Sequence, residues 1–176
     1  TRRLFVEMKL QGQLVLVGAN HHTALVAQRE KLSLDAARTA EFYTGIKSLP
    51  RVRESFVLNT CNRLEVYANI EQVDAIEPIK KFLCDFNHLD WAEFESIQFQ
   101  RLDLEAITHL FEVASGVDSQ IVGEAEILGQ VKEAYTVATR LGSIGPVLNR
   151  LIQKSFQAAK WIRTHTAIGE GQINTA

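Results

Sequence analysis

Cys61 has neighbours suited to chemistry, although the 176-residue chain contains only two cysteines. On an extended backbone, residues two apart point to the same side, so Cys61 and Arg63 would share one face. Glu65 and Tyr67 would extend that face. A guanidinium beside a thiol favours the thiolate, which is the nucleophilic form of cysteine. Cys61 is therefore a candidate nucleophile.

Other interpretations of the same residues stay open. Arg63 could instead hold a substrate carboxylate through two parallel hydrogen bonds, a geometry that suits arginine better than lysine. In a purely structural alternative, Arg63 pairs with Glu65 and Cys61 only fills space, as most buried cysteines do. Residue types alone favour this structural alternative. Cys84 follows Leu83 on a predicted helix, and we interpret it as structural.

A histidine and a polar segment could complete a site. His109 lies on a predicted helix and could be the acid–base partner of a distant cysteine, although a single helical histidine is more often packed or solvated. The segment VDSQIVGEAEILGQ is either a helix N-terminus with acids suited to the helix dipole, or a polar rim for an amino-acid-like ligand. Its polar members are Asp118, Ser119, Glu124, Glu126 and Gln130. No zinc-type spacing and no dinucleotide-binding glycine fingerprint occurs, so we expect no metal.

Composition indicates an ordinary globular domain. The chain is 46% hydrophobic and 23% charged, with a net charge of −2 and an isoelectric point of about 6.2. This charge gives no general sign of a nucleic-acid or membrane partner, although a local patch could still bind one. No signal peptide opens the sequence and no apolar run is long enough to span a bilayer. We therefore expect a cytoplasmic protein, or a stromal one in a plant plastid, with reduced thiols.

Periodicity predicts how these residues are positioned. Two β-branched runs, SFVLNT and LEVYANI, flank Cys61 and form either an antiparallel pair or one strand with a corner. With the strand QLVLVGAN before them and SIQFQRLD after them, the order is strand, helix, strand, strand, helix, strand. This order is typical of the ferredoxin-like split βαβ fold, of class α+β. The two helices are predicted from Ser33, as N-cap, to Gly45, and over residues 76–86.

The sequence from Asp103 onward predicts helices alone. The first carries an apolar stripe and stops at Gly116, the second stops at Gly142, and the third begins at Pro146. The stripe consists of Leu104, Ile107, Phe111 and Ala114. Cations on the third helix are interpreted as a solvated face: Arg150, Lys154, Lys160 and Arg163. We expect residues 1–145 to form one domain and residues 146–176 a helix with the start of a linker.

Three segments, in order, resemble the glutamyl-tRNA reductase family: VGANHHTALVAQREKLSL, NTCNRLEVY and HLFEVASGVDSQIVGEAEILGQVKEAY. The resemblance implies an oxidoreductase that converts glutamyl-tRNA to glutamate-1-semialdehyde with NADPH, in tetrapyrrole biosynthesis. It also implies that residues 1–145 are the catalytic domain and that the NADPH-binding and dimerisation domains are absent here. Expected partners are glutamyl-tRNA, a second copy in the full-length homodimer, and glutamate-1-semialdehyde aminomutase.

The resemblance also implies roles for single residues. Cys61 would form a thioester with the glutamyl group, Arg63 would grip the glutamate α-carboxylate, and His109 would be needed for activity. The substrate-binding set would be Thr60, Asn62, Arg63, Ser119, Glu124, Ala125, Glu126 and Gln130. Glu126 and Leu25 depart from the family, which often has glutamine and proline there. The chain alone is expected to form the acyl-enzyme without reducing it. The alternative is a non-catalytic module that binds charged tRNA or a regulatory protein.

Overall fold

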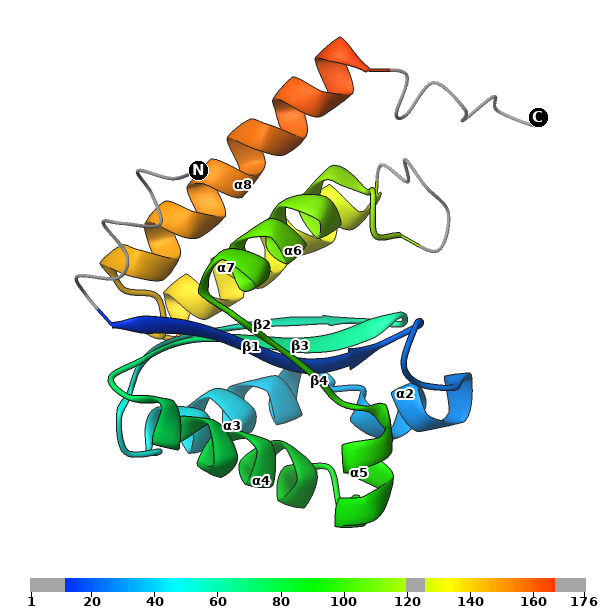
Figure 1. The fold of residues 1–176 in the computed structure, drawn as a ribbon, viewed down its shortest axis with the longest axis vertical. Helices are drawn as coiled ribbons and strands as arrows, with labels where there is room; N and C mark the ends of the chain where they lie inside the picture. The colour runs from blue at the N-terminus through cyan, green and yellow to red at the C-terminus, as the bar shows by residue number, and fades with distance from the viewer. Residues whose placement is uncertain (1–11, 120–125, 167–176) are drawn as a thin grey trace.

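The computed structural model describes residues 12–119 and 126–166, in which helices cover both faces of one sheet (Figure 1). The sheet lies between a layer formed by α2 to α5 and a layer formed by α6 to α8. Because both faces are covered, the central strand β3 (Arg63–Ile70) is buried along its whole length. The polar residues of that strand therefore need partners within the protein.

The sheet has the predicted topology. Its strands lie in the order β2-β3-β1-β4, and every neighbouring pair is antiparallel. Each helical crossover thus joins two parallel strands that have a third strand between them, which is the split βαβ arrangement. The remaining strands are β1 (Gln13–Asn20), β2 (Val52–Thr60) and β4 (Phe99–Leu102). The two runs that flank Cys61 are confirmed as an antiparallel pair.

The first helical layer differs in detail from the prediction. Its helices are α2 (Val26–Leu32), α3 (Ala36–Lys47), α4 (Ile76–Phe86) and α5 (Trp91–Ile97), with a short 3₁₀ turn η1 (Val73–Ala75) before α4. Only one helical turn was expected at α2, and α5 was missed.

The start of α3 was placed too early. Ser33 ends α2, and Asp35 is the N-cap of α3, where its carboxylate accepts a hydrogen bond from the Arg38 amide at 2.8 Å. Aspartate and serine are both good N-caps, so residue types alone do not choose between them.

The second layer contains the three predicted helices α6 (Asp103–Ser115), α7 (Glu126–Arg140) and α8 (Pro146–His165). Gly116 ends α6 in the left-handed region, with φ of 79°. One member of the predicted apolar stripe is wrong, since Leu104 is 46% exposed while Leu110 is buried in its place. No helix among the described residues is long and apolar enough to cross a bilayer.

A buried carboxylate fixes α8 to the sheet. Glu54 on β2 accepts backbone hydrogen bonds from Gly145 at 3.0 Å, Val147 at 3.2 Å and Leu148 at 2.8 Å. These amides belong to the N-cap and first turn of α8. Their N–H groups have no acceptor within the helix, and they carry the positive end of the helix dipole. α8 then packs along α6.

Candidate active site

Cys61 lies in the tight turn between β2 and β3. The strands close with Thr60 opposite Arg63, which leaves Cys61 and Asn62 as the two turn residues. The Asn62 amide donates to the Thr60 hydroxyl at 3.1 Å, and Arg29 Nε donates to the Cys61 carbonyl at 3.3 Å. Cys61 is exposed, so it does not fill space in the core. The predicted alternation therefore begins at Arg63 rather than at Cys61.

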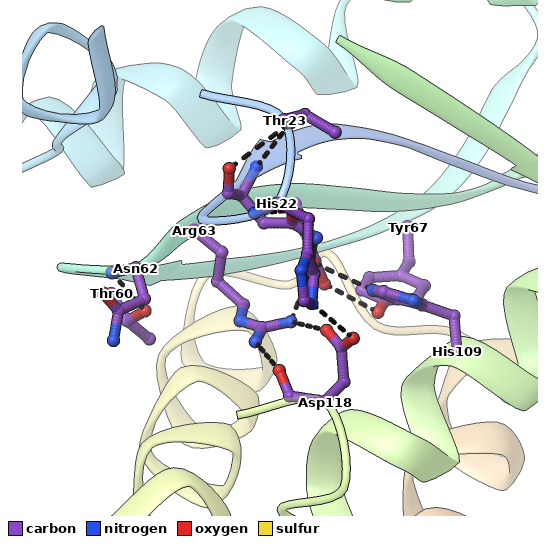
Figure 2. A network of polar contacts seen from close by, with 10 residues as sticks. His22, Thr23, Thr60, Asn62, Arg63, Tyr67, His109 and Asp118 are labelled. Atoms are coloured by element: carbon purple, nitrogen blue, oxygen red, sulfur yellow. Dashed lines mark hydrogen bonds and ion pairs between the residues drawn. The ribbon is translucent and has the colours of Figure 1, made fainter. Parts of the chain in front are cut away.

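Arg63, Glu65 and Tyr67 share one face of β3, where Arg63 and Tyr67 (labelled in Figure 2) both donate to Glu65. Arg63 Nη1 donates to Glu65 Oε1 at 3.0 Å, and the Tyr67 hydroxyl donates to Glu65 Oε2 at 3.0 Å. His109 on α6 reaches Glu65 Oε1 through Nε2 at 2.9 Å. The Arg63–Glu65 pairing of the structural alternative is thus present, inside a larger network.

Asp118 binds Arg63 from the segment that follows α6. Arg63 Nη1 lies 2.9 Å from Asp118 Oδ2, and Arg63 Nη2 donates to the Asp118 carbonyl at 2.7 Å. His22 Nε2 lies 3.1 Å from the other carboxylate oxygen of Asp118 (Figure 2). The Arg63 guanidinium is therefore fixed between two carboxylates from distant parts of the chain.

The network sets the charge state of its members. Burial alone would raise the pKa of Glu65, but the hydrogen bond from His109 and the charge of Arg63 lower it to about 2. Burial would lower the pKa of His109, yet the hydrogen bond and charge of Glu65 raise it above its usual value. Burial and the neighbouring Glu65 carboxylate hold the pKa of Tyr67 well above its usual range. Glu65 is thus ionised, and His109 tends to be protonated.

A small cavity joins Cys61 to the buried guanidinium. Its volume is about 50 Å³, and its lining residues are Thr60, Cys61, Asn62, Arg63, Ser119, Glu126, Ile127 and Gln130. The Arg63 side chain is 99% buried, and among the described residues its Nε has no hydrogen-bond partner. A buried donor without an acceptor is costly, so this atom favours an acceptor arriving from the cavity. Of these lining residues, only Ile127 was not predicted as a site residue.

Of the other predicted site residues, the structure places His109 away from this cavity. His109 lines a separate, more open cavity of about 700 Å³ with Asn20, His22, Phe99, Arg101 and others. Among the described residues, no hydrogen bond joins His109 to Cys61; His109 binds Glu65, Glu65 binds Arg63, and Arg63 lines the same cavity as Cys61. Glu124 and Ala125 lie outside the described residues.

A profile described as "Glutamyl-tRNAGlu reductase, N-terminal domain" matches residues 17–166. The chain belongs to this family. Glutamyl-tRNA reductases of Pseudomonas paraeruginosa and Pseudomonas fluorescens are 40% and 41% identical to it over 162 and 160 residues. The alignments cover 92% and 91% of this chain but only 38% and 37% of those reductases. The chain thus spans little more than a third of the length of these relatives.

A solved reductase shares the fold. The structure of glutamyl-tRNA reductase from Methanopyrus kandleri matches with a TM-score of 0.76 and 34% identity, over 92% of this chain and 37% of that one. The family match continues to residue 166 and so spans α8.

Three acidic and imidazole groups of this reductase domain lie close enough to suggest a metal site. Glu65, His109 and Asp118 each offer a ligand atom, and these atoms lie within 4.8 Å of one another. However, Arg63 is hydrogen-bonded to both carboxylates, at 3.0 and 2.9 Å. A metal ion would be repelled by that guanidinium, so the arrangement suits a protonated imidazole better.

Two residues of this candidate site did not emerge from the sequence as site residues. Glu65 was identified only as a neighbour of Arg63, although its place two residues further along the strand was a sufficient signal. His22 was not a candidate, and no local pattern indicates its contact with Asp118, 96 residues away. Such contacts depend on how the β1–α2 loop meets the end of α6.

Proposed function

We propose that this chain carries out the acyl-transfer step of a glutamyl-tRNA reductase. Cys61 attacks the ester of glutamyl-tRNA, which yields a glutamyl thioester on the protein and free tRNA. One observation carries the proposal: an exposed thiol shares a small cavity with a buried guanidinium that retains an unused donor. The relatives are named for the same substrate.

The step balances without a further reagent. A bond forms between Cys61 Sγ and the acyl carbon, and the bond from that carbon to the ribose oxygen breaks. The thiol proton ends on the ribose hydroxyl that leaves with the tRNA. Since the α-carboxyl group is part of the ester, the side-chain carboxylate of the glutamyl group is the acceptor for Arg63 Nε.

Glu65 and His109 act as positioning residues in this proposal. Glu65 and the Asp118 carboxylate both accept from Nη1, and the Asp118 carbonyl accepts from Nη2, so Nε is the donor left without a partner among the described residues. His109 donates to Glu65 and keeps that carboxylate ionised in the protein interior. A pre-positioned guanidinium loses less side-chain freedom when substrate binds.

The residues of this chain do not fit NADPH. The turn after β1 reads Asn-His-His-Thr and lacks the glycines that let a pyrophosphate approach a helix N-terminus. The described sheet is antiparallel and offers no crossover of the dinucleotide-binding type. We therefore assign the reduction to the part of the reductase outside the matched third and derive no hydride step here.

A trapping experiment tests the proposal. The protein is incubated with glutamyl-tRNA that carries a radiolabelled glutamate, quenched in acid, and examined for protein-bound label. We expect label on the wild-type protein, released by hydroxylamine, and none on Cys61→Ser. Cys84→Ser is the matched control, because Cys84 is buried and its thiol donates to the Leu89 carbonyl.

Two results would contradict the proposal. Label that persists on Cys61→Ser would place the acyl group on another residue. Unlabelled protein that still binds the tRNA would favour the alternative of a recognition module without chemistry.

A further inference from the structure

The charged side chains of the last helix are all of one sign. α8 contains Arg150, Lys154, Lys160 and Arg163 and no aspartate or glutamate, whereas the whole chain has a net charge of −2. Surface helices that only need solvation usually mix both signs. The sequence alone suggested a solvated face here, but that interpretation does not account for the missing acids.

Part of this charge lines a groove between α7 and α8. The groove has a volume of about 370 Å³ and is lined by Leu128, Lys132, Gln153, Phe156, Gln157, Lys160, Arg163 and Thr164. Three of these residues are cations, none is a carboxylate, and the two glutamines add amide donors. Lys132 Nζ lies 5.9 Å from the centre of the Phe156 ring. Among the described residues, neither Lys132 nor Lys160 forms an ion pair.

An exposed tryptophan lies beside the groove. Trp161 is 61% exposed and stacks on His165, with ring centres 4.7 Å apart and planes inclined by 16°. On a helix, residues three and four apart are neighbours, so Trp161 adjoins the groove residues Gln157 and Thr164. Cations together with an accessible aromatic face are the usual elements of a single-stranded nucleic-acid site.

The groove lies next to the Cys61 cavity. Ile127 and Gln130 of α7 line that cavity, while Leu128 and Lys132 line the groove. The two sites are therefore on opposite sides of the first turns of α7, separated by roughly the 10 Å diameter of one helix. A strand whose end reaches Cys61 can continue across α7 to α8, the long helix at the upper edge of Figure 1.

We propose that the groove between α7 and α8 binds the phosphodiester backbone of the RNA that carries the glutamyl ester. This inference rests on the proposed function, since that function brings an RNA 3′ end to Cys61. Lys132 and Lys160 contact phosphates, and Trp161 stacks on an unpaired base. A concave groove with polar donors suits separate phosphate groups better than a flat lipid surface, which calls for an exposed apolar face.

Fluorescence anisotropy with a labelled tRNA tests the inference at several salt concentrations. The tRNA is uncharged and is the acceptor specific for glutamate, so binding is measured without the chemistry at Cys61. The variant Lys132→Glu/Lys160→Glu should bind roughly tenfold more weakly at 0.15 M salt, with a salt slope smaller by about 1.5 to 2. Trp161→Ala should weaken binding at least about fivefold with an unchanged salt slope.

The matched control is Lys81→Glu, because Lys81 is an exposed cation on α4, on the opposite side of the sheet. It should bind the tRNA as the wild type does. The rate at which iodoacetamide alkylates Cys61 and the thermal unfolding midpoint show whether each variant keeps the folded turn.

The outcomes separate this inference from the proposed function. Wild-type affinity in the double lysine variant, or no tRNA binding by the wild type, would overturn the groove assignment while labelling of Cys61 stands. Equal weakening by Lys81→Glu would also overturn it, since the attraction would then be general. If the double lysine variant loses binding to anionic lipid vesicles while its tRNA binding is unchanged, the groove binds a membrane surface instead. Weakened tRNA binding without any label on Cys61 would support the groove and contradict the acyl transfer.

Discussion

At the scale of single residues, the main feature is a fully buried carboxylate with four partners, of which Asn20 donates through Nδ2 at 3.5 Å. Glu65 joins Arg63, His109 and Tyr67, at distances of 2.9 to 3.0 Å. A buried ion is tolerated when it is paired and hydrogen-bonded, and removing one partner leaves an uncompensated charge. The chain therefore depends on Glu65 both for stability and for the direction of the Arg63 guanidinium.

Glu65→Gln keeps the shape of this side chain and removes its charge. We expect the free energy of unfolding to fall by about 3 kcal/mol, because Arg63 and His109 lose their common counter-ion. Label transfer to Cys61 should fall more than the fraction of folded protein does. Urea unfolding and the trapping experiment measure the two effects. Unchanged stability would show that Asp118 alone compensates Arg63.

The network also predicts how stability depends on pH. The pKa of Glu65 is lowered from 4.5 to about 2, so its contribution is complete above about pH 4.5 and is lost as the pH falls toward 2. The pKa of His109 is raised from 6.5, so its contribution is present below pH 6.5 and is lost as the pH rises through the folded value. Stability from this pair should be greatest between these limits.

Urea unfolding at a series of pH values checks this dependence. His109→Asn should remove the loss of stability above pH 6.5 that we expect of the wild type. His88→Asn is the control, because His88 lies in the left-handed region with φ of 53°, which asparagine tolerates. If the stability of His109→Asn falls above pH 6.5 as much as that of the wild type, a group other than His109 causes the loss.

At the scale of elements, the attachment of α8 depends on one glutamate. Glu54→Gln replaces a carboxylate that accepts three amides of the first turn of α8. We expect a loss of about 2 kcal/mol of unfolding free energy, together with faster hydrogen exchange at Val147 and Leu148. Glu71→Gln removes an exposed ion pair with Arg53 and should change stability by less than about 0.5 kcal/mol. Equal effects of the two variants would contradict the role of Glu54.

Two glycines provide opposite tests of close packing. A Cβ atom at Gly145 would lie 2.6 Å from Glu54 Cδ, which is held by its hydrogen bonds, so Gly145→Ala should cost about 2 kcal/mol. At Gly129, on the exposed side of α7, an added Cβ meets nothing within 4 Å. Gly129→Ala should therefore stabilise the protein by about 0.5 to 1 kcal/mol. Thermal unfolding of both variants measures the difference, and a gain at Gly145 would show that Glu54 can move.

At the scale of the whole molecule, α8 supplies part of the core. Its side chains Leu148, Leu151 and Ile152 are fully buried. Each buried aliphatic side chain of this size contributes about 1.5 to 3 kcal/mol, and a typical domain is stable by only 5 to 15 kcal/mol.

Ending the chain at residue 145 tests the predicted boundary between two parts. The shortened protein should lose the cooperative thermal transition, because α6 would expose its apolar face and Glu54 would lose its amide partners. Circular dichroism during heating measures this directly. A sharp transition at the wild-type temperature would show that residues 1–145 fold alone.

Local patterns anticipated much of this structure. Short β-branched runs predicted the strands, helical spacing predicted α4, α6, α7 and α8, and Gly116, Gly142 and Pro146 marked helix ends as expected. The choice between Ser33 and Asp35 as N-cap failed, as did the detection of α5. Both depend on how a short segment packs against its neighbours rather than on its own residue types.

The sequence by itself determined the fold class and the family, and it made Cys61 and Arg63 candidates for the chemistry proposed above. The fold class follows from short apolar runs and helical spacing, which backbone geometry converts into strands and helix faces, and the family follows from three segments that resemble it. Only the tertiary structure decided that Cys61 is exposed, that Asp118 and His109 fix the Arg63–Glu65 pair, and that a basic groove adjoins the site. The physical reason is that these contacts join residues far apart in the chain, and they form only when helices and sheet bury their common surface.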